Sequence, residues 1–142
     1  MRKILILMPL VLLAVAGATT QPESIDSLKE QAAKATGKQQ AELDVKIAEH
    51  QVRALDADYN SGNVERAQVA LKDVVEYSQR AATAASDSGK HLKQTEVAMR
   101  KMAEKLQDIQ KTLSVDDRPP VKEAVEKLQK LREELLARMF KR

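Results

Sequence analysis

Small and apolar residues recur at alternating spacings of three and four positions along one central stretch of the chain, from Val64 to Leu113. They keep a single heptad phase: Val64, Ala67, Leu71, Val74, Ser78, Ala81, Ala85, Ser88, Leu92, Thr95, Met99, Met102, Leu106, Ile109 and Leu113. This periodicity is typical of a helix that presents a narrow apolar seam to another helix. It predicts a continuous helix over residues 63–113, roughly 75 Å long. Such a rod cannot bury its seam alone, so we expect the flanking segments to fold back onto it.

Two helices are predicted before this central stretch. Ser24 is a suitable N-cap for a short helix over residues 24–36, which Gly37 interrupts. A second helix over residues 38–60 carries a clean apolar seam and ends where Gly62 can adopt a positive φ angle. Because the connection is short, we expect the next helix to run antiparallel to it.

Two prolines separate the central helix from the last one. The residue before a proline avoids the helical region, so Pro119 and Pro120 end the central helix. Pro120 also fits the first turn of a final helix over residues 120–140. Residues 19–142 are therefore predicted to form one all-α domain of elongated antiparallel hairpins, with coiled-coil-like packing on one long central helix.

The segment Ser86–Gly89 supports an alternative architecture. Glycine in a helix interior costs about 1 kcal/mol relative to alanine, and the neighbouring Ser and Asp residues compete for backbone hydrogen bonds. A turn here would divide the central helix and give a compact four-helix bundle. The heptad phase continues through the segment, so we favour the continuous helix and keep the bundle as the alternative.

The stretch from Tyr59 to Val74 resembles the middle of a tetratricopeptide repeat. An aromatic residue precedes a glycine turn, and a small residue follows in the next helix. The resemblance implies a helical hairpin in which Gly62 makes the turn and Ala67 lets the two helices approach closely. It covers about one repeat, and no copy follows at the 34-residue period of that family. The spacing of Ala67, Leu71 and Val74 is echoed 57 residues later by Ala124, Leu128 and Leu131.

The first eighteen residues have the three regions of a secretory signal peptide. Arg2 and Lys3 are followed by an apolar run over Ile4–Val15 and by the small residues Ala16-Gly17-Ala18. The run is too short for a comfortable membrane span, although an uncleaved anchor is the alternative. We expect cleavage after Ala18 and a periplasmic or secreted mature protein. The chain contains no Cys, so we expect neither a lipoprotein anchor nor disulfides.

Composition supports the all-α prediction, and the charge distribution argues against one class of function, nucleic-acid binding. Tyr59, Tyr77 and Phe140 are the only aromatic residues, whereas the strong helix formers are abundant. The chain has 24 basic and 21 acidic residues, and removal of Arg2 and Lys3 leaves 22 against 21, a net charge of +1. Nearly neutral, interspersed charge is not the basic surface of a nucleic-acid-binding protein.

The sequence offers little that indicates catalysis, a cofactor or a metal site. His91 lies four residues after Asp87, which would place both on one face of a continuous helix, but zinc sites need three or four ligands. His50 falls opposite the seam of the second helix, and we interpret both histidines as solvated surface residues. Most carboxylates have a basic partner one turn away, and no motif of a nucleophilic serine or a phosphate loop occurs. We therefore expect no enzymatic activity and no cofactor.

Two groups of apolar residues exceed what one packing seam requires. Leu43 and Ile47 form a second stripe on the second helix, and the last helix ends in Leu136, Met139 and Phe140 with basic residues between them. These groups either close a local helical layer or bind a partner, which we expect to be another protein or a second copy of the chain. At the C-terminus, weak contact with a membrane surface is a further hypothesis.

These features predict a non-enzymatic exported helical scaffold or protein-interaction module of the cell envelope. The alternative is a periplasmic chaperone-like or stress-related protein that holds unfolded clients. A chaperone should expose a broad concave apolar surface, whereas this sequence uses its apolar residues in narrow seams. Binding of a hydrophobic dye, strong for the chaperone and weak for the module, distinguishes the two hypotheses.

Overall fold

The computed structural model describes residues 23–141, in which every regular element is a helix. In chain order these are α1 (Ile25–Lys34), α2 (Gly37–Asn60), α3 (Val64–Ser88), α4 (Leu92–Thr112), the short 3-10 helix η1 (Val115–Asp117) and α5 (Arg118–Phe140). The all-α prediction is therefore confirmed. The predicted signal peptide and its cleavage site lie outside the described residues.

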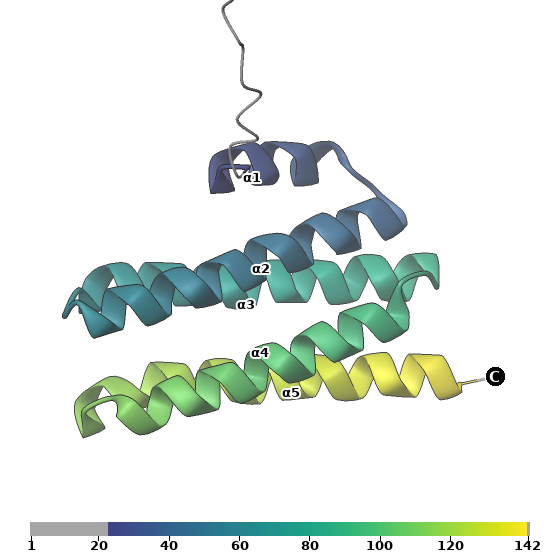
Figure 1. The fold of residues 1–142 in the computed structure, drawn as a ribbon. Coiled ribbons are helices and arrows are strands. Elements are labelled where there is room, and N and C mark those ends of the chain that lie inside the picture. Colours follow the sequence, from purple (N-terminus) through teal and green to yellow (C-terminus); the bar gives the residue numbers. More distant parts are fainter. Residues whose placement is uncertain (1–22, 142) are drawn as a thin grey trace, which may run out of the picture.

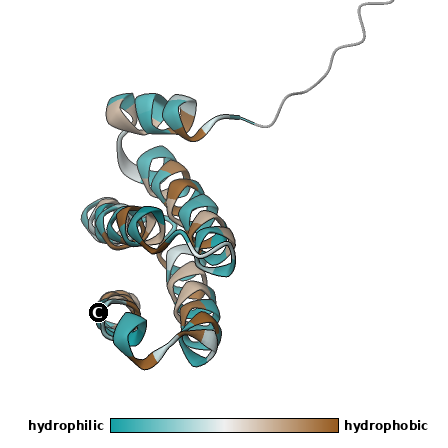
Figure 2. Ribbon diagram, turned by 90° about the vertical axis from the view of Figure 1, so that its left-hand side faces the viewer, coloured by the Kyte–Doolittle hydropathy of each residue, from teal (hydrophilic) through white to brown (hydrophobic). Residues whose placement is uncertain are grey.

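Two antiparallel helical hairpins are stacked on each other (Figure 1). α2 packs along α3 in the first hairpin, and α4 packs along α5 in the second. Across the stack, Lys105 Nζ of α4 lies 3.3 Å from Asp56 Oδ2 of α2, and Arg138 Nε of α5 donates to Ser86 O of α3 at 3.3 Å. Each helix of one hairpin is thus parallel to its neighbour in the other. α1 covers the outer side of the first hairpin, so the molecule has three successive layers (Figure 2).

Helix packing differs in kind between the two hairpins. The first hairpin buries a row of alanines without exposed surface, from Ala41 and Ala48 of α2 to Ala67, Ala81 and Ala85 of α3. Small side chains let two helix backbones approach closely over a long contact. The second hairpin instead fills its interior with the larger side chains Met99, Leu106, Leu128 and Leu135, which are also fully buried. A single cluster of buried apolar residues joins both hairpins and α1.

The prediction of one continuous helix over residues 63–113 is wrong, and the alternative turn is correct. α3 ends at Ser88, and Gly89 and His91 have φ angles of 66° and 65° before α4 begins at Leu92. A glycine with positive φ is a common helix terminator. Ser88 Oγ closes the end of α3 by donating to Ala84 O at 2.7 Å and accepting from the N–H of Lys90 at 3.2 Å. The heptad phase persists because α3 and α4 turn their seams toward the same core.

The other predicted boundaries agree closely with the structure. Ser24 caps α1 by accepting a hydrogen bond from the N–H of Ser27 at 3.2 Å. Gly62 has a φ angle of 78° in the turn between α2 and α3, and Ala67 is fully buried, as we expected for these two positions. The last helix begins two residues earlier than predicted, at Arg118, since both prolines fit its first turn. The relationship to tetratricopeptide repeats itself stays a prediction.

Candidate functional site

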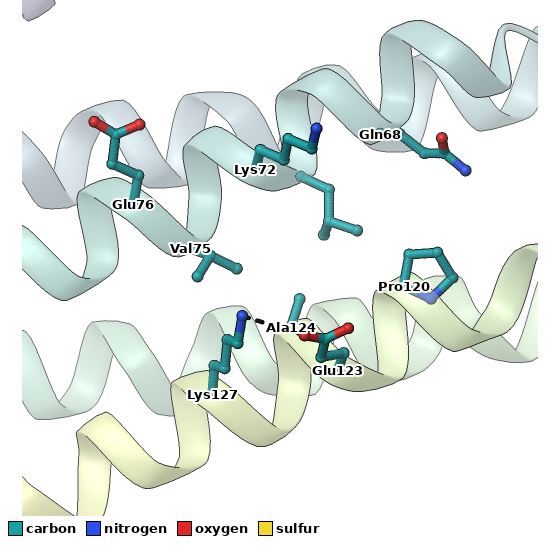
Figure 3. Close-up of a pocket in the computed structure, with 9 residues that line it drawn as sticks. Gln68, Lys72, Val75, Glu76, Pro120, Glu123, Ala124 and Lys127 are labelled. Carbon is teal, nitrogen blue, oxygen red and sulfur yellow. Dashed lines mark ion pairs between the residues drawn. The ribbon is translucent and has the colours of Figure 1, made fainter.

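A groove of about 460 Å³ lies between α3 and α5, the two parallel helices on one side of the stack (Figure 3). Five residues of α3 and four of α5 line it: Gln68, Leu71, Lys72, Val75 and Glu76, with Pro120, Glu123, Ala124 and Lys127. The two helices belong to different hairpins and touch less extensively than the partners within a hairpin. The small side chain of Ala124 leaves the space open where a larger residue would close it.

The floor of the groove is apolar. Leu71, Val75 and Ala124 form it, and Val75 is half-buried whereas Leu71 and Ala124 are almost completely buried. Pro120 lies at one end, across from Gln68 (Figure 3). Solvent-accessible apolar surface of this kind gains free energy when another apolar group covers it.

The rim of the groove carries four exposed charges in an alternating arrangement. On α3, Lys72 is followed one turn later by Glu76, whereas on α5 the order is reversed, Glu123 and then Lys127. Because the helices are parallel, Lys72 lies across from Glu123, and Glu76 lies across from Lys127 (Figure 3). Within α5, Lys127 Nζ is 3.2 Å from Glu123 Oε1. Two cations and two anions thus surround an apolar centre with no net charge.

A polar cluster on the other side of α3 fixes α1 to the first hairpin. Asp73 Oδ2 accepts hydrogen bonds from Lys29 Nζ of α1 and Gln51 Nε2 of α2, both at 2.7 Å. The Lys29 nitrogen also lies 5.5 Å from the centre of the Tyr77 ring, and the Arg80 guanidinium lies 5.0 Å from the same ring. The hydrogen bond from Lys29 to Asp73 raises the pKa of Lys29, although burial opposes the rise.

Asp44 of α2 is a fully buried carboxylate that our sequence reasoning missed. Its Oδ2 lies 3.5 Å from Arg80 Nε. Burial raises the pKa of Asp44, and the positive charge of Arg80 opposes this rise. The position could have been found from its spacing, because it lies three residues after Ala41 and four before Ala48, both core residues. A carboxyl group without exposed surface cannot meet a substrate in this arrangement, so we assign Asp44 to the packing of α2 on α3.

The two histidines are not the solvated surface residues that we expected. His91 is half-buried at the N-cap of α4, with Nδ1 3.6 Å from Glu42 Oε1, and the turn separates it from the helix that carries Asp87. His50 is also half-buried, and its Nδ1 is inaccessible to solvent. Among residues 23–141, no three His, Cys, Asp or Glu side chains come together in a way that could hold a metal ion.

The structure separates the five residues that we assigned to a partner-binding surface. Leu43 and Ile47 are core residues, with 8% and 0% exposure, so of the two roles that we left open their burial fits the local helical layer. The physical reason is that α1, α3 and α4 all contact α2, which therefore needs more than one apolar face. Leu136 and Met139 are half-buried near the end of α5, and Phe140 is 80% exposed. A partner role for these three residues stays a prediction.

The sequence identified the groove residues as seam or surface positions of two separate helices, but it did not show that they lie together. Recognising the groove requires knowing that α3 lies beside α5, which depends on the turn at Gly89. One available signal was the 57-residue echo, which relates the seam residues Ala67 and Leu71 of α3 to Ala124 and Leu128 of α5.

Comparison of the chain with protein-family models, with curated proteins and with solved structures finds no match. None of the helices within residues 23–141 has both the length and the apolar character that crossing a membrane requires.

Proposed function

We propose that the protein is a non-enzymatic helical scaffold of the cell envelope that binds another polypeptide in the α3/α5 groove. The observation that supports this proposal is the apolar floor of Leu71, Val75 and Ala124 surrounded by charged residues. Protein–protein interfaces have the same organisation, with an apolar centre and a polar rim. The first eighteen residues support export to the envelope.

The groove is suited to binding because the two helices that form its walls are fixed by contacts on their opposite faces. Val74 and Leu128, on the core sides of α3 and α5, have no exposed surface. On the far side of α3, Asp73 and Tyr77 attach α1 to the same hairpin. A preformed groove avoids the entropic cost of ordering its walls when a partner binds. An amphipathic helix is a suitable occupant, since its apolar face would cover the floor while its flanking residues meet the rim.

Site-specific photocrosslinking in cells tests this function. A photoreactive amino acid replaces Val75 on the groove floor, and the same amino acid replaces Glu133 in a control variant. Glu133 is exposed on α5 and does not line the groove. We expect discrete protein adducts from position 75 and none of the same mass from position 133. Identical adduct patterns at both positions, or no adduct from position 75, would contradict the proposal.

The chaperone hypothesis receives less support from the described surface. Three large apolar side chains are strongly exposed in this part of the chain, Val69, Val115 and Phe140, and they belong to α3, η1 and α5 respectively. A client-binding surface would gather such residues into one patch. We therefore expect weak binding of a hydrophobic dye by the folded protein. Strong dye fluorescence without loss of helicity would favour the chaperone function instead.

A further inference from the structure

We infer that the occupant of the α3/α5 groove is a second copy of this chain, and that the protein forms a two-fold symmetric dimer through this face. The inference rests on the proposed function, because it assigns a partner to the same groove. Two independent properties of the groove lead to it: the arrangement of its four rim charges and its apolar floor, of which Val75 is only half-buried.

The rim charges are complementary to themselves under two-fold symmetry. In a dimer whose axis runs along the helices, Lys72 meets Glu123 of the second copy, and Glu76 meets Lys127 of the second copy. In a dimer whose axis runs across the helices, Lys72 meets Glu76 of the second copy, and Glu123 meets Lys127. Both results follow from the charge order, which alternates along each helix and across the groove (Figure 3). Face-to-face docking therefore pairs opposite charges with either axis.

The same arrangement argues against a partner of strong charge. A groove that selects an acidic or basic peptide carries a rim of the opposite sign. Here two lysines and two glutamates balance each other, so a uniformly charged partner would meet repulsion at half of the rim. A second copy meets no such repulsion, and it brings its own half-buried Val75 to the contact, so that solvent is excluded from both Val75 side chains.

The size of the groove predicts a weak and reversible dimer. Nine residues line the groove, whereas a stable interface usually has about 20–30 residues on each side. Neighbouring residues of α3 and α5 would add to the contact, but the apolar centre is small. We therefore expect association that depends strongly on protein concentration.

Charge reversal gives a direct test with two complementary variants. The first, Lys72→Glu with Lys127→Glu, makes the rim entirely acidic, and the second, Glu76→Lys with Glu123→Lys, makes it entirely basic. Sedimentation velocity of the purified exported protein should show a concentration-dependent dimer for the wild type. Each variant alone should associate at least about tenfold more weakly because like charges face each other. An equimolar mixture of the two variants should restore the dimer.

A matched control carries the same change of net charge away from the groove. Lys101→Glu with Lys122→Glu alters exposed residues of α4 and α5 that do not line it, and it should dimerise like the wild type. Circular dichroism establishes that all variants are folded before the comparison is made.

Several results would overturn the inference, and they are separable from failure of the proposed function. The dimer is excluded if the wild type stays monomeric even near about 1 mM, if the all-acidic variant dimerises normally, or if the mixture does not associate. If such a result accompanies a crosslink from position 75 to a different protein, the proposed function stands and the second copy is rejected. If position 75 also yields no crosslink, both are rejected.

Discussion

Asp44 shows how one buried carboxyl group links the fold to pH. Burial raises the pKa of Asp44 above its ordinary value of 3.8, so the folded protein binds this proton more tightly than the unfolded chain does. As the pH rises between the ordinary and the raised pKa, the Asp44 contribution to the free energy of unfolding therefore decreases, and above that window it stays constant. Ionised Asp44 is thus less favourable to folding than protonated Asp44.

Replacing Asp44 by Asn should remove this pH dependence. Urea unfolding at about pH 4 and about pH 7 measures the stability of the wild type relative to Asp44→Asn. We expect the wild type to be relatively more stable at the lower pH. The exposed Asp87→Asn variant serves as the control for a general effect of removing a carboxylate. A relative stability that is equal at both pH values, or greater at pH 7, would contradict the assigned direction of the pKa.

Substitution of Gly89 tests the turn that separates α3 from α4. Its φ angle of 66° is unfavourable for a residue with a Cβ atom, by roughly 1–2 kcal/mol. A Cβ atom at this position would meet Arg138 Nη2 at an ordinary contact distance of 3.6 Å, so backbone strain and not a clash decides the effect. We expect Gly89→Ala to lower the free energy of unfolding by about that amount. Thr83→Ala, at an exposed position inside α3, is the control. A gain in stability would indicate that residue 89 is helical.

At the residue scale, the sequence contained usable information about both Gly89 and Asp44, and in both cases we interpreted it differently. The composition of Ser86–Gly89 favoured a turn, and we gave more weight to the uninterrupted heptad phase. That phase reports which face of a helix is buried, and two successive helices packed on one core can share it. Asp44 was missed because a charged residue next to a seam is ordinarily interpreted as solvent-exposed, and its partner Arg80 lies on another helix.

At the scale of elements, one ion pair joins the two helices of the second hairpin. Arg132 Nε of α5 lies 2.7 Å from Glu96 Oε1 of α4, and Glu96 is almost completely buried. Arg132→Met leaves that carboxylate without its partner, so we expect a loss of about 1–3 kcal/mol in the free energy of unfolding. Partial exposure of Arg132 allows water to reach the carboxylate and limits the loss.

A double-mutant cycle isolates the pair from the packing of each side chain. Glu96→Gln and the combined Glu96→Gln, Arg132→Met variant complete the cycle, measured by urea unfolding. We expect Arg132→Met to cost less in the Glu96→Gln background, because the amide carries no charge that needs a partner. Equal costs in both backgrounds would mean that Arg132 acts through packing alone.

The attachment of α1 gives a second prediction about elements. Asp73 of α3 accepts hydrogen bonds from both Lys29 of α1 and Gln51 of α2, so Asp73→Ala removes the polar link between α1 and the first hairpin. We expect faster amide hydrogen exchange in α1, with little change in α4 and α5. The exposed Asp87→Ala variant is the control. Faster exchange throughout the molecule, or none in α1, would contradict a local role.

Apart from the turn at Gly89, the helix boundaries and the antiparallel α2/α3 hairpin were predicted from the sequence, whereas the stacking of the two hairpins was not. Gly62 and the two prolines act through local backbone preferences, which depend on the residue type alone. The pairing of α3 with α5 depends on how two hairpins stack, and local periodicity carries no such information. The second apolar stripe of Leu43 and Ile47 indicated that α2 is covered on more than one side, but a stripe does not identify the helices that cover it.

For the molecule as a whole, residues of α3 and α4 serve to distinguish the stacked hairpins from the predicted continuous helix. The two architectures place these residues at very different distances from each other. Glu65 lies near the start of α3, and Lys111 lies near the end of α4. In a continuous helix these residues, 46 positions apart (111 minus 65), would be about 69 Å from each other. In the stack both lie at the same end. The salt-bridge atoms of Arg66 and Asp58 are 3.9 Å apart, and those of Lys105 and Asp56 are 3.3 Å apart, so the start of α3 and the later part of α4 both meet the last turns of α2.

Distance measurement between spin labels at Glu65→Cys and Lys111→Cys distinguishes these architectures, and the absence of native cysteine makes the labelling specific. Both positions are exposed, so the labels should not disturb packing. Neighbouring helices lie about 8–10 Å apart, so we expect a separation of about 20–30 Å including the labels. The pair Glu65→Cys with Asp87→Cys, both within α3, should give about 33 Å in either architecture and calibrates the method. A distance near about 69 Å for the first pair would support the continuous helix. It would also contradict the groove, because the groove exists only where the turn at Gly89 brings α5 beside α3.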